Sequence, residues 1–206
     1  MFAPTLTGLG ERAHLASPDV NLETHIADIV GVIEYEDLKD AAVVGHSATG
    51  TVIAGVADRL PGRVAHLIYL DSVVPGDGDS AWDLLGAFNT EWLEKMLASS
   101  EHDWLIPVPD DDHPFGIRDD ADAAWVRSKL TPQPVRPWRD ALHLSRALTS
   151  TQSYIYCDWR GNTYAETAAR VRSNAAWRYR ELRTGHDAMV TAPRELADLL
   201  VELASR

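Results

Sequence analysis

The feature that most constrains the fold is a short apolar run that ends at a glycine and leads directly into a helical pattern. The run Ala41 to Val44 ends at Gly45 and is too short for a helix, so it predicts a buried strand. The helical pattern covers Ala48 to Leu60 and is stopped by Pro61 and Gly62. Ala65 to Leu70 is a second buried run. A strand, a helix and a strand at this spacing predict a βαβ unit, and therefore a parallel sheet covered by helices on both faces.

The same alternation surrounds this unit. Apolar residues recur at helical spacing between positions 22 and 33, and Asn21 is placed to cap that helix. Later in the chain we expect strands over Ser153 to Cys157 and Trp177 to Leu182, and helices over Tyr164 to Val171 and Pro193 to Ala204. An α/β fold with a mostly parallel sheet follows from this order of elements.

Residues 76–150 interrupt the alternation. This stretch holds five of the seven tryptophans and many prolines, which indicates helices and loops inserted over the sheet. We therefore expect one structural domain in which residues 1–75 and 151–206 form the core and residues 76–150 form a small helical cap.

The composition excludes several classes of function. The chain has 31 acidic and 19 basic side chains and a formal net charge of -12, which repels nucleic-acid phosphates and anionic lipid surfaces. It contains no run of 18 apolar residues, no visible secretory signal, and a single cysteine, Cys157. We expect a cytoplasmic protein with neither a nucleic-acid nor a membrane partner.

The junction between the first strand and its helix, Gly45-His46-Ser47-Ala48-Thr49-Gly50, has the pattern of a nucleophile elbow. Such a turn raises a serine hydroxyl above the sheet, and the helix start aims the Ala48 N–H at a developing oxyanion. The last glycine of the usual G-x-S-x-G pattern is Thr49 here, with Gly50 one step later. Ser47 is therefore the candidate nucleophile, and His46 is expected to line the substrate pocket.

A serine hydroxyl needs a base, and His186 is the best placed of the eight histidines because it follows the last predicted strand. The remaining histidines outside the elbow, His25 among them, are expected to be surface or packing residues. The acid that orients the imidazole has two candidates. Asp158 follows the strand that ends at Cys157 and is preferred on position, while Asp71 ends an earlier strand and is the alternative. Asp187 is expected to be structural.

With these residues identified, the sequence resembles the α/β-hydrolases related to plant hydroxynitrile lyases and methylesterases, especially their bacterial esterase-like members. The matching segments are residues 2–12, the elbow, residues 69–75 and residues 185–189. The resemblance implies a serine–histidine–aspartate catalytic triad under a small helical cap, with no metal and no organic cofactor.

Two departures from the family bear on activity. Hydroxynitrile lyases of this group carry a lysine after the catalytic histidine, where this chain has Asp187, which favours ester or thioester hydrolysis. Family members also begin with a strand and a helix ahead of the segment that matches residues 2–12, and we expect both to be missing here. One oxyanion donor would then be lost and a strand edge left unpaired, which predicts a weak or inactive hydrolase and invites a partner chain, such as a homodimer.

The sequence therefore predicts a serine hydrolase of the carboxylesterase type that acts on a small ester or thioester through an acyl-enzyme. Two alternatives stay open at this point. A catalytically silent hydrolase fold could serve as a binding or assembly module, and an acyltransferase could use the same triad with an alcohol in place of water.

Overall fold

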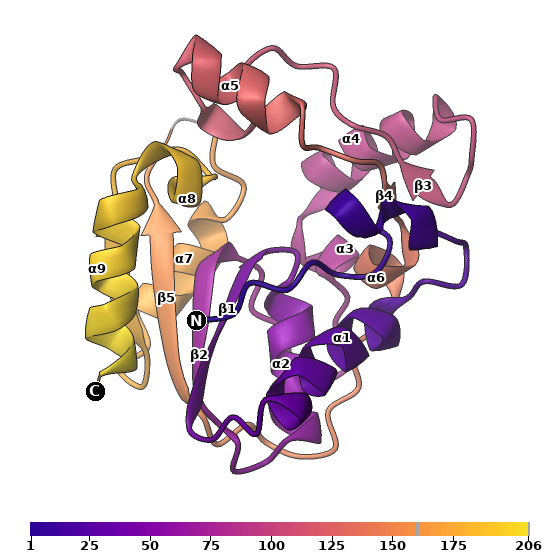
Figure 1. Cartoon of the computed structure of the whole chain (residues 1–206). Coiled ribbons are helices and arrows are strands. Elements are labelled where there is room, and N and C mark those ends of the chain that lie inside the picture. The colour runs from indigo at the N-terminus through magenta and orange to yellow at the C-terminus, as the bar shows by residue number, and fades with distance from the viewer. Residues whose placement is uncertain (160, 206) are drawn as a thin grey trace.

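The computed structural model describes residues 1–159 and 161–205, without the side chains of residues 87 and 88. Its centre is a four-stranded parallel sheet in the order β1-β2-β5-β6 (Figure 1). The strands are β1 (Ala41–Ser47), β2 (Val64–Ser72), β5 (Thr151–Cys157) and β6 (Arg178–Leu182). The predicted α/β fold with a mostly parallel sheet is confirmed.

Successive residues of the inner strands β2 and β5 are buried on opposite faces of the sheet. On one face, Leu67, Tyr69 and Tyr154 share an apolar cluster with α1 (Leu22–Tyr35), α2 (Gly50–Arg59) and α7 (Ala165–Arg172). On the other face, Ile68, Leu70 and Ile155 pack with α8 (Ala188–Thr191) and α9 (Pro193–Ala204). Figure 1 shows α1 and α2 on one side of the strands and α9 on the other. The core is therefore a sheet between two layers of helices.

The strand β1 differs from its sequence-based expectation on one face. Val43 packs against the cluster of α1 and α2, but Ala42 is exposed and Val44 is 41% exposed. The prediction that Ala41 to Val44 are buried on both faces is therefore wrong. The reason is topological, since β1 is the edge strand of the described sheet and the apolar cluster of α9 is built on β2 and β5.

Residues 76–150 build the upper part of the molecule in Figure 1, where they are mostly helix and loop as expected. Their short helices and strands surround an apolar cluster of their own that includes Trp82, Leu93 and Val135. A two-stranded antiparallel ladder between β3 and β4 was not predicted, because two residues per strand leave no periodicity to detect. The elements within residues 76–150 are α3 (Ala81–Leu84), α4 (Ala87–Ala98), β3 (Leu105–Ile106), η2 (Pro114–Gly116), α5 (Asp120–Arg127), β4 (Gln133–Pro134) and α6 (Arg136–Arg139). One further short helix, η1 (Gly10–Leu15), lies ahead of α1 in the chain.

The helix ends follow the sequence signals closely. Asn21 caps α1 through a capping box, in which its side chain accepts from the Thr24 N–H and the Thr24 hydroxyl accepts from the Asn21 N–H. The helix α9 begins at Pro193 and ends at Ala204, as predicted. In the part of the chain that the structure describes, no helix combines the length and apolarity needed to cross a bilayer.

The position of Gly50 explains how the elbow tolerates a threonine at the preceding position. A Cβ atom placed on Gly50 would lie 2.0 Å from the carbonyl oxygen of Val73 and 2.6 Å from the hydroxyl of Ser72. The start of α2 therefore touches the backbone that follows β2 at Gly50, not at Thr49. The Thr49 hydroxyl instead accepts from the His46 N–H at 2.8 Å and donates to the His46 carbonyl at 2.7 Å, which closes the turn.

Replacing Gly50 should therefore destabilise the protein far more than replacing a free helical glycine. We expect Gly50→Ala to lower the free energy of unfolding by about 3 kcal/mol, because the contact is with backbone that must shift. Gly31 in the middle of α1 has open space around its Cβ position, so Gly31→Ala should raise stability by about 0.5–1 kcal/mol. Urea unfolding of both variants measures the difference, and equal midpoints would contradict this account.

Candidate active site

The candidate nucleophile and an aspartate lie at the carboxyl ends of neighbouring parallel strands. Ser47 is the last residue of β1 and Asp71 is near the end of β2, and the two strands are paired in register from Ala42 to His46. Both residues have positive φ, 59° for Ser47 and 40° for Asp71, in the left-handed region that side chains other than glycine rarely adopt. Backbone strain of this kind is concentrated at functional sites, and here it lifts both side chains out of the strand direction.

The turn after Ser47 leaves one amide group available. The Ser47 carbonyl accepts from the Val73 N–H at 3.1 Å and from the Ser72 hydroxyl at 2.5 Å, which ties the turn to the end of β2. The Ala48 N–H has no hydrogen-bond acceptor among the described residues. An unused amide directly after a serine on such a turn is the geometry required of an oxyanion donor.

The imidazole of His186 is buried and is oriented by a carboxylate. Its Nδ1 lies 2.7 Å from Oδ2 of Asp71, and its backbone N–H donates to the Phe115 carbonyl at 2.8 Å. Because the carboxylate accepts from Nδ1–H, the neutral ring carries its lone pair on Nε2. The arrangement is that of a base and its orienting acid.

The structure gives the contact with His186 to Asp71 and not to Asp158, the residue preferred from the sequence. The Asp71 carboxylate is fully buried, and its Oδ1 accepts from the Cys157 N–H at 3.2 Å and from Asn162 Nδ2 at 2.8 Å. The Asp158 side chain is exposed, and its N–H donates to the Leu182 carbonyl at 2.7 Å, which extends the pairing of β5 with β6. Both aspartates end a strand, so position along the chain could not distinguish them.

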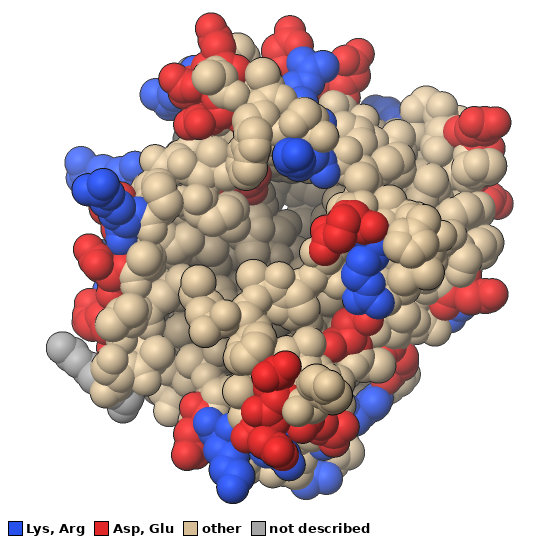
Figure 2. Space-filling view, viewed as in Figure 1, with Lys and Arg blue, Asp and Glu red and all other residues tan. Residues whose placement is uncertain are grey.

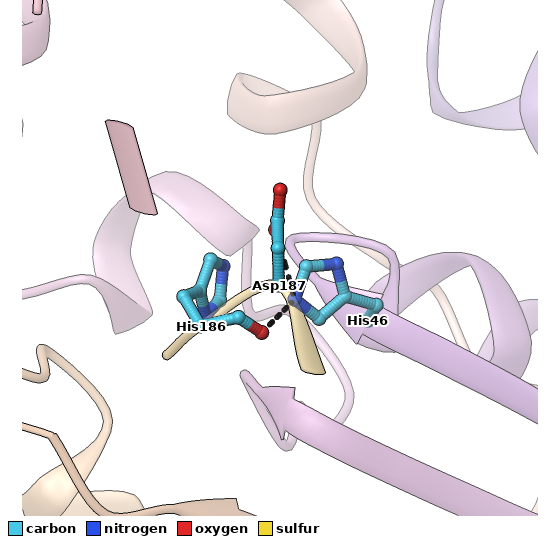
Figure 3. A group of neighbouring side chains, drawn as sticks. All are labelled: His46, His186 and Asp187. Carbon is cyan, nitrogen blue, oxygen red and sulfur yellow. Dashed lines mark hydrogen bonds and ion pairs between the residues drawn. The ribbon is translucent and has the colours of Figure 1, made fainter. Parts of the chain in front are cut away.

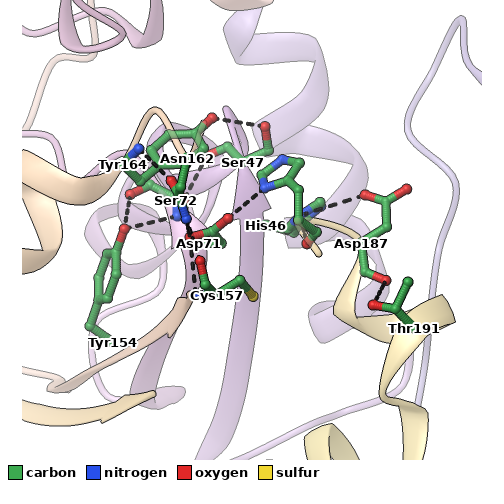
Figure 4. A network of polar contacts seen from close by, with 11 residues as sticks. His46, Ser47, Asp71, Ser72, Tyr154, Cys157, Asn162, Tyr164, Asp187 and Thr191 are labelled. Atoms are coloured by element: carbon green, nitrogen blue, oxygen red, sulfur yellow. Dashed lines mark hydrogen bonds and ion pairs between the residues drawn. The ribbon is translucent and has the colours of Figure 1, made fainter. Parts of the chain in front are cut away.

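Tyr164 contacts both candidate catalytic side chains, and the sequence analysis identified it only as the start of a helix. Its hydroxyl lies 3.0 Å from Ser47 Oγ (Figure 4). Its ring is stacked on His186, with centroids 5.5 Å apart and planes 16° apart. Among the described residues, the Ser47 hydroxyl makes its hydrogen bond with Tyr164. No pattern in the sequence signals such a residue, since it comes from the loop after β5.

His46 and Asp187 lie next to the imidazole of His186 (Figure 3). His46 Nε2 lies 3.0 Å from the His186 carbonyl oxygen and 3.9 Å from Asp187 Oδ1, and the two imidazole rings are 4.2 Å apart. Burial, and then the neighbouring His186, lower the pKa of His46 well below its ordinary value, so the ring is neutral and donates to the carbonyl. Burial raises the pKa of Asp187, and the nearby His186 lowers it by a smaller amount. Asp187 therefore faces the site, whereas a purely structural role was expected.

Among the described residues, the side chains that could share a metal ion are these same three. Ligand atoms of His46, His186 and Asp187 lie within 4.8 Å of one another. His46 Nε2 already contacts the His186 carbonyl oxygen, and His186 Nδ1 already contacts Asp71. Two imidazoles and a carboxylate suit zinc chemically, yet an ion here would take the base away from Ser47.

A cavity of about 260 Å³ contains Ser47, Ala48, His46 and His186 in its lining, so the four residues predicted for the elbow and base meet in one space. Figure 2 shows the surface hollowed between the cap and the core. His25 also lines this cavity, although a surface or packing role was expected for it. The remaining walls are mostly apolar, and Leu6, Leu9, Phe115, Leu130, Pro134 and Trp138 contribute to them.

The chain is similar to known proteins of one family. Residues 1–199 match the model of the alpha/beta hydrolase family. A carbendazim hydrolyzing esterase from Nocardioides sp. (strain SG-4G) is 34% identical over 219 residues, which cover 98% of this chain and 87% of that protein.

Solved structures show the same fold. An extracellular alpha/beta-hydrolase from a Paenibacillus species, described as sharing structural and functional homology with tobacco salicylic acid binding protein 2, superposes with a TM-score of 0.82 and 25% identity over 97% of this chain and 85% of that one. Tomato methylketone synthase I has a TM-score of 0.73 at 14% identity, covering 97% and 84% of the two chains. The predicted resemblance is confirmed: this chain belongs to the alpha/beta hydrolase family.

Proposed function

We propose that this protein is a carboxylesterase that cleaves a small ester or thioester through an acyl-enzyme on Ser47. The observation that carries the proposal is that Ser47, on a strained turn, and His186, oriented by Asp71, line one cavity. The relative from Nocardioides is named an esterase, which supports the same bond class. The fold alone would not distinguish among the many chemistries of this family.

The first half of the reaction forms the acyl-enzyme. The Ser47 O–H turns from Tyr164 toward His186 and gives its proton to Nε2 of His186 while Oγ bonds to the substrate carbonyl carbon. The carbonyl electron pair moves onto oxygen, which the free Ala48 N–H is placed to bind. As the intermediate collapses, the proton on Nε2 passes to the departing alcohol or thiol. Asp71 stabilises the imidazolium through its contact with Nδ1.

The second half repeats these steps with water. Nε2 takes a proton from the water molecule, the hydroxide oxygen attacks the acyl carbon, and Ser47 recovers its proton from the imidazole as the acid leaves. The volume of about 260 Å³ and the apolar walls favour a compact, uncharged acyl or alcohol group. The Asp187 carboxylate at the same cavity disfavours an anionic substrate.

A fluorophosphonate probe and a p-nitrophenyl ester test the nucleophile. We expect the probe to label Ser47, as mapped by mass spectrometry, and Ser47→Ala to abolish labelling and lower ester hydrolysis by at least about 10³-fold, because no other group can form the acyl bond. Ser128→Ala, at the exposed end of α5, is the matched control and should behave as the unchanged protein. An unlabelled, folded protein would favour a binding module over an enzyme.

The assignment of the acid is tested by comparing two aspartates. Asp71→Asn should lower kcat by about 10⁴-fold, because an amide in this position favours the wrong imidazole tautomer. Asp158→Asn should leave kcat within about twofold, since its side chain is exposed. Steady-state kinetics on the p-nitrophenyl ester measures both, with circular dichroism to verify folding. Similar losses in the two variants would contradict the role assigned to Asp71.

A further inference from the structure

Tyr164 is held against the reacting oxygen by contacts on three sides. Its hydroxyl lies 3.0 Å from Ser47 Oγ, its ring stacks on His186, and its N–H donates to Asn162 Oδ1 at 2.6 Å. Asn162 in turn donates to Asp71. The tyrosine is only 4% exposed, so its hydroxyl acts where water offers little competition. The position of Tyr164 is thus coupled to all three residues of the proposed triad.

The Tyr164 hydroxyl can donate a hydrogen bond only while the phenol is protonated. Burial raises the pKa of Tyr164 above its ordinary value, so the phenol is protonated at neutral pH. In the resting site either hydroxyl can donate to the other. Once the Ser47 proton has passed to His186, Oγ has no hydrogen left, and Tyr164 becomes the donor of the pair.

We propose that the Tyr164 hydroxyl is a catalytic group that acts with the Ala48 N–H to stabilise the oxyanion formed on Ser47. This inference rests on the proposed esterase function. The oxyanion is the former carbonyl oxygen, attached to the carbon that bonds to Oγ, so a donor in contact with Oγ lies next to the new negative charge. Once Ser47 has lost its proton, the phenol donates a hydrogen bond and transfers no proton, since the proton of Ser47 goes to His186 and then to the leaving group. Tyr164 thereby adds a side-chain donor to the backbone donor at Ala48.

Packing alone would require the ring of Tyr164 but not its oxygen. The ring belongs to the apolar cluster of the cap, together with Val73 and Trp82, and a phenylalanine would fill that space equally well. The hydroxyl faces Ser47 instead of solvent. Removal of this one oxygen therefore separates the catalytic role from the packing role.

The test is Tyr164→Phe in the full chain, assayed on a p-nitrophenyl ester. We expect kcat to fall by about 10²-fold with KM changed less than about threefold, since a donor used mainly by the oxyanion is removed. Inhibition by a trifluoromethyl ketone, which forms a tetrahedral oxyanion on serine, should weaken by a similar factor. Tyr179→Phe removes a hydroxyl that donates to Glu181 outside the cavity and should leave both values unchanged.

A second variant keeps the hydroxyl and guards against a folding effect. Incorporation of 3-fluorotyrosine at position 164 should retain kcat within about fivefold, while Tyr164→Phe does not. If Tyr164→Phe keeps kcat and ketone affinity within threefold of the unchanged protein, the oxyanion role is wrong, although the esterase assignment stands. If the unchanged protein neither hydrolyses esters nor labels at Ser47, the esterase assignment fails as well.

Discussion

The buried carboxylate of Asp71 is the interaction on which the rest of the site depends. A carboxylate removed from water is tolerated only when its oxygens are fully hydrogen-bonded, and here His186, Asn162 and the Cys157 N–H supply the donors. These donors come from two separate parts of the chain, the end of β5 with the loop after it and the loop after β6. The carboxylate therefore joins the loop after β6 and the loop after β5 to the end of β2, and the energetic penalty of an unsatisfied charge keeps those loops in place.

The parallel sheet brings this carboxylate and the candidate nucleophile Ser47 to the same edge. The carboxyl ends of parallel strands meet at one edge, so the residues that follow β1, β2, β5 and β6 converge without any special loop length. The close contact at Gly50 then brings the start of α2 against the backbone after β2, and Ala48 lines the cavity. Positive φ at Ser47 and Asp71 is maintained because the backbone on both sides of each residue is hydrogen-bonded or packed.

Sequence patterns predicted what depends on local order, and they were less informative about side-chain direction. The periodicity identified every strand of the described parallel sheet and the helices α1, α2, α7 and α9, because burial on one or both faces leaves a repeat in an element of sufficient length, but it did not identify the four-residue α8. Ser47 and His186 were instead singled out by their places after predicted strands, near Gly45 and Gly185. The choice between Asp71 and Asp158 depended on which side chain turns into the buried site, and the exposure of Val44 depended on which strand is the edge. Neither property is a local pattern.

The cap segment, residues 76–150, packs against side chains of the candidate active site. Its apolar cluster includes Val73 and Tyr164 from the core, with Ala48 and Trp138 packed against it. Trp138 and Ala48 also line the cavity, so the wall that a substrate meets is continuous with the groups that would bind the oxyanion. A change of volume in the cap therefore reaches Tyr164 through direct contact, because a close-packed cluster transmits displacement. Under the function proposed for this protein, a change in the cap would therefore alter the contact between the Tyr164 hydroxyl and Ser47 as well as the shape of the cavity.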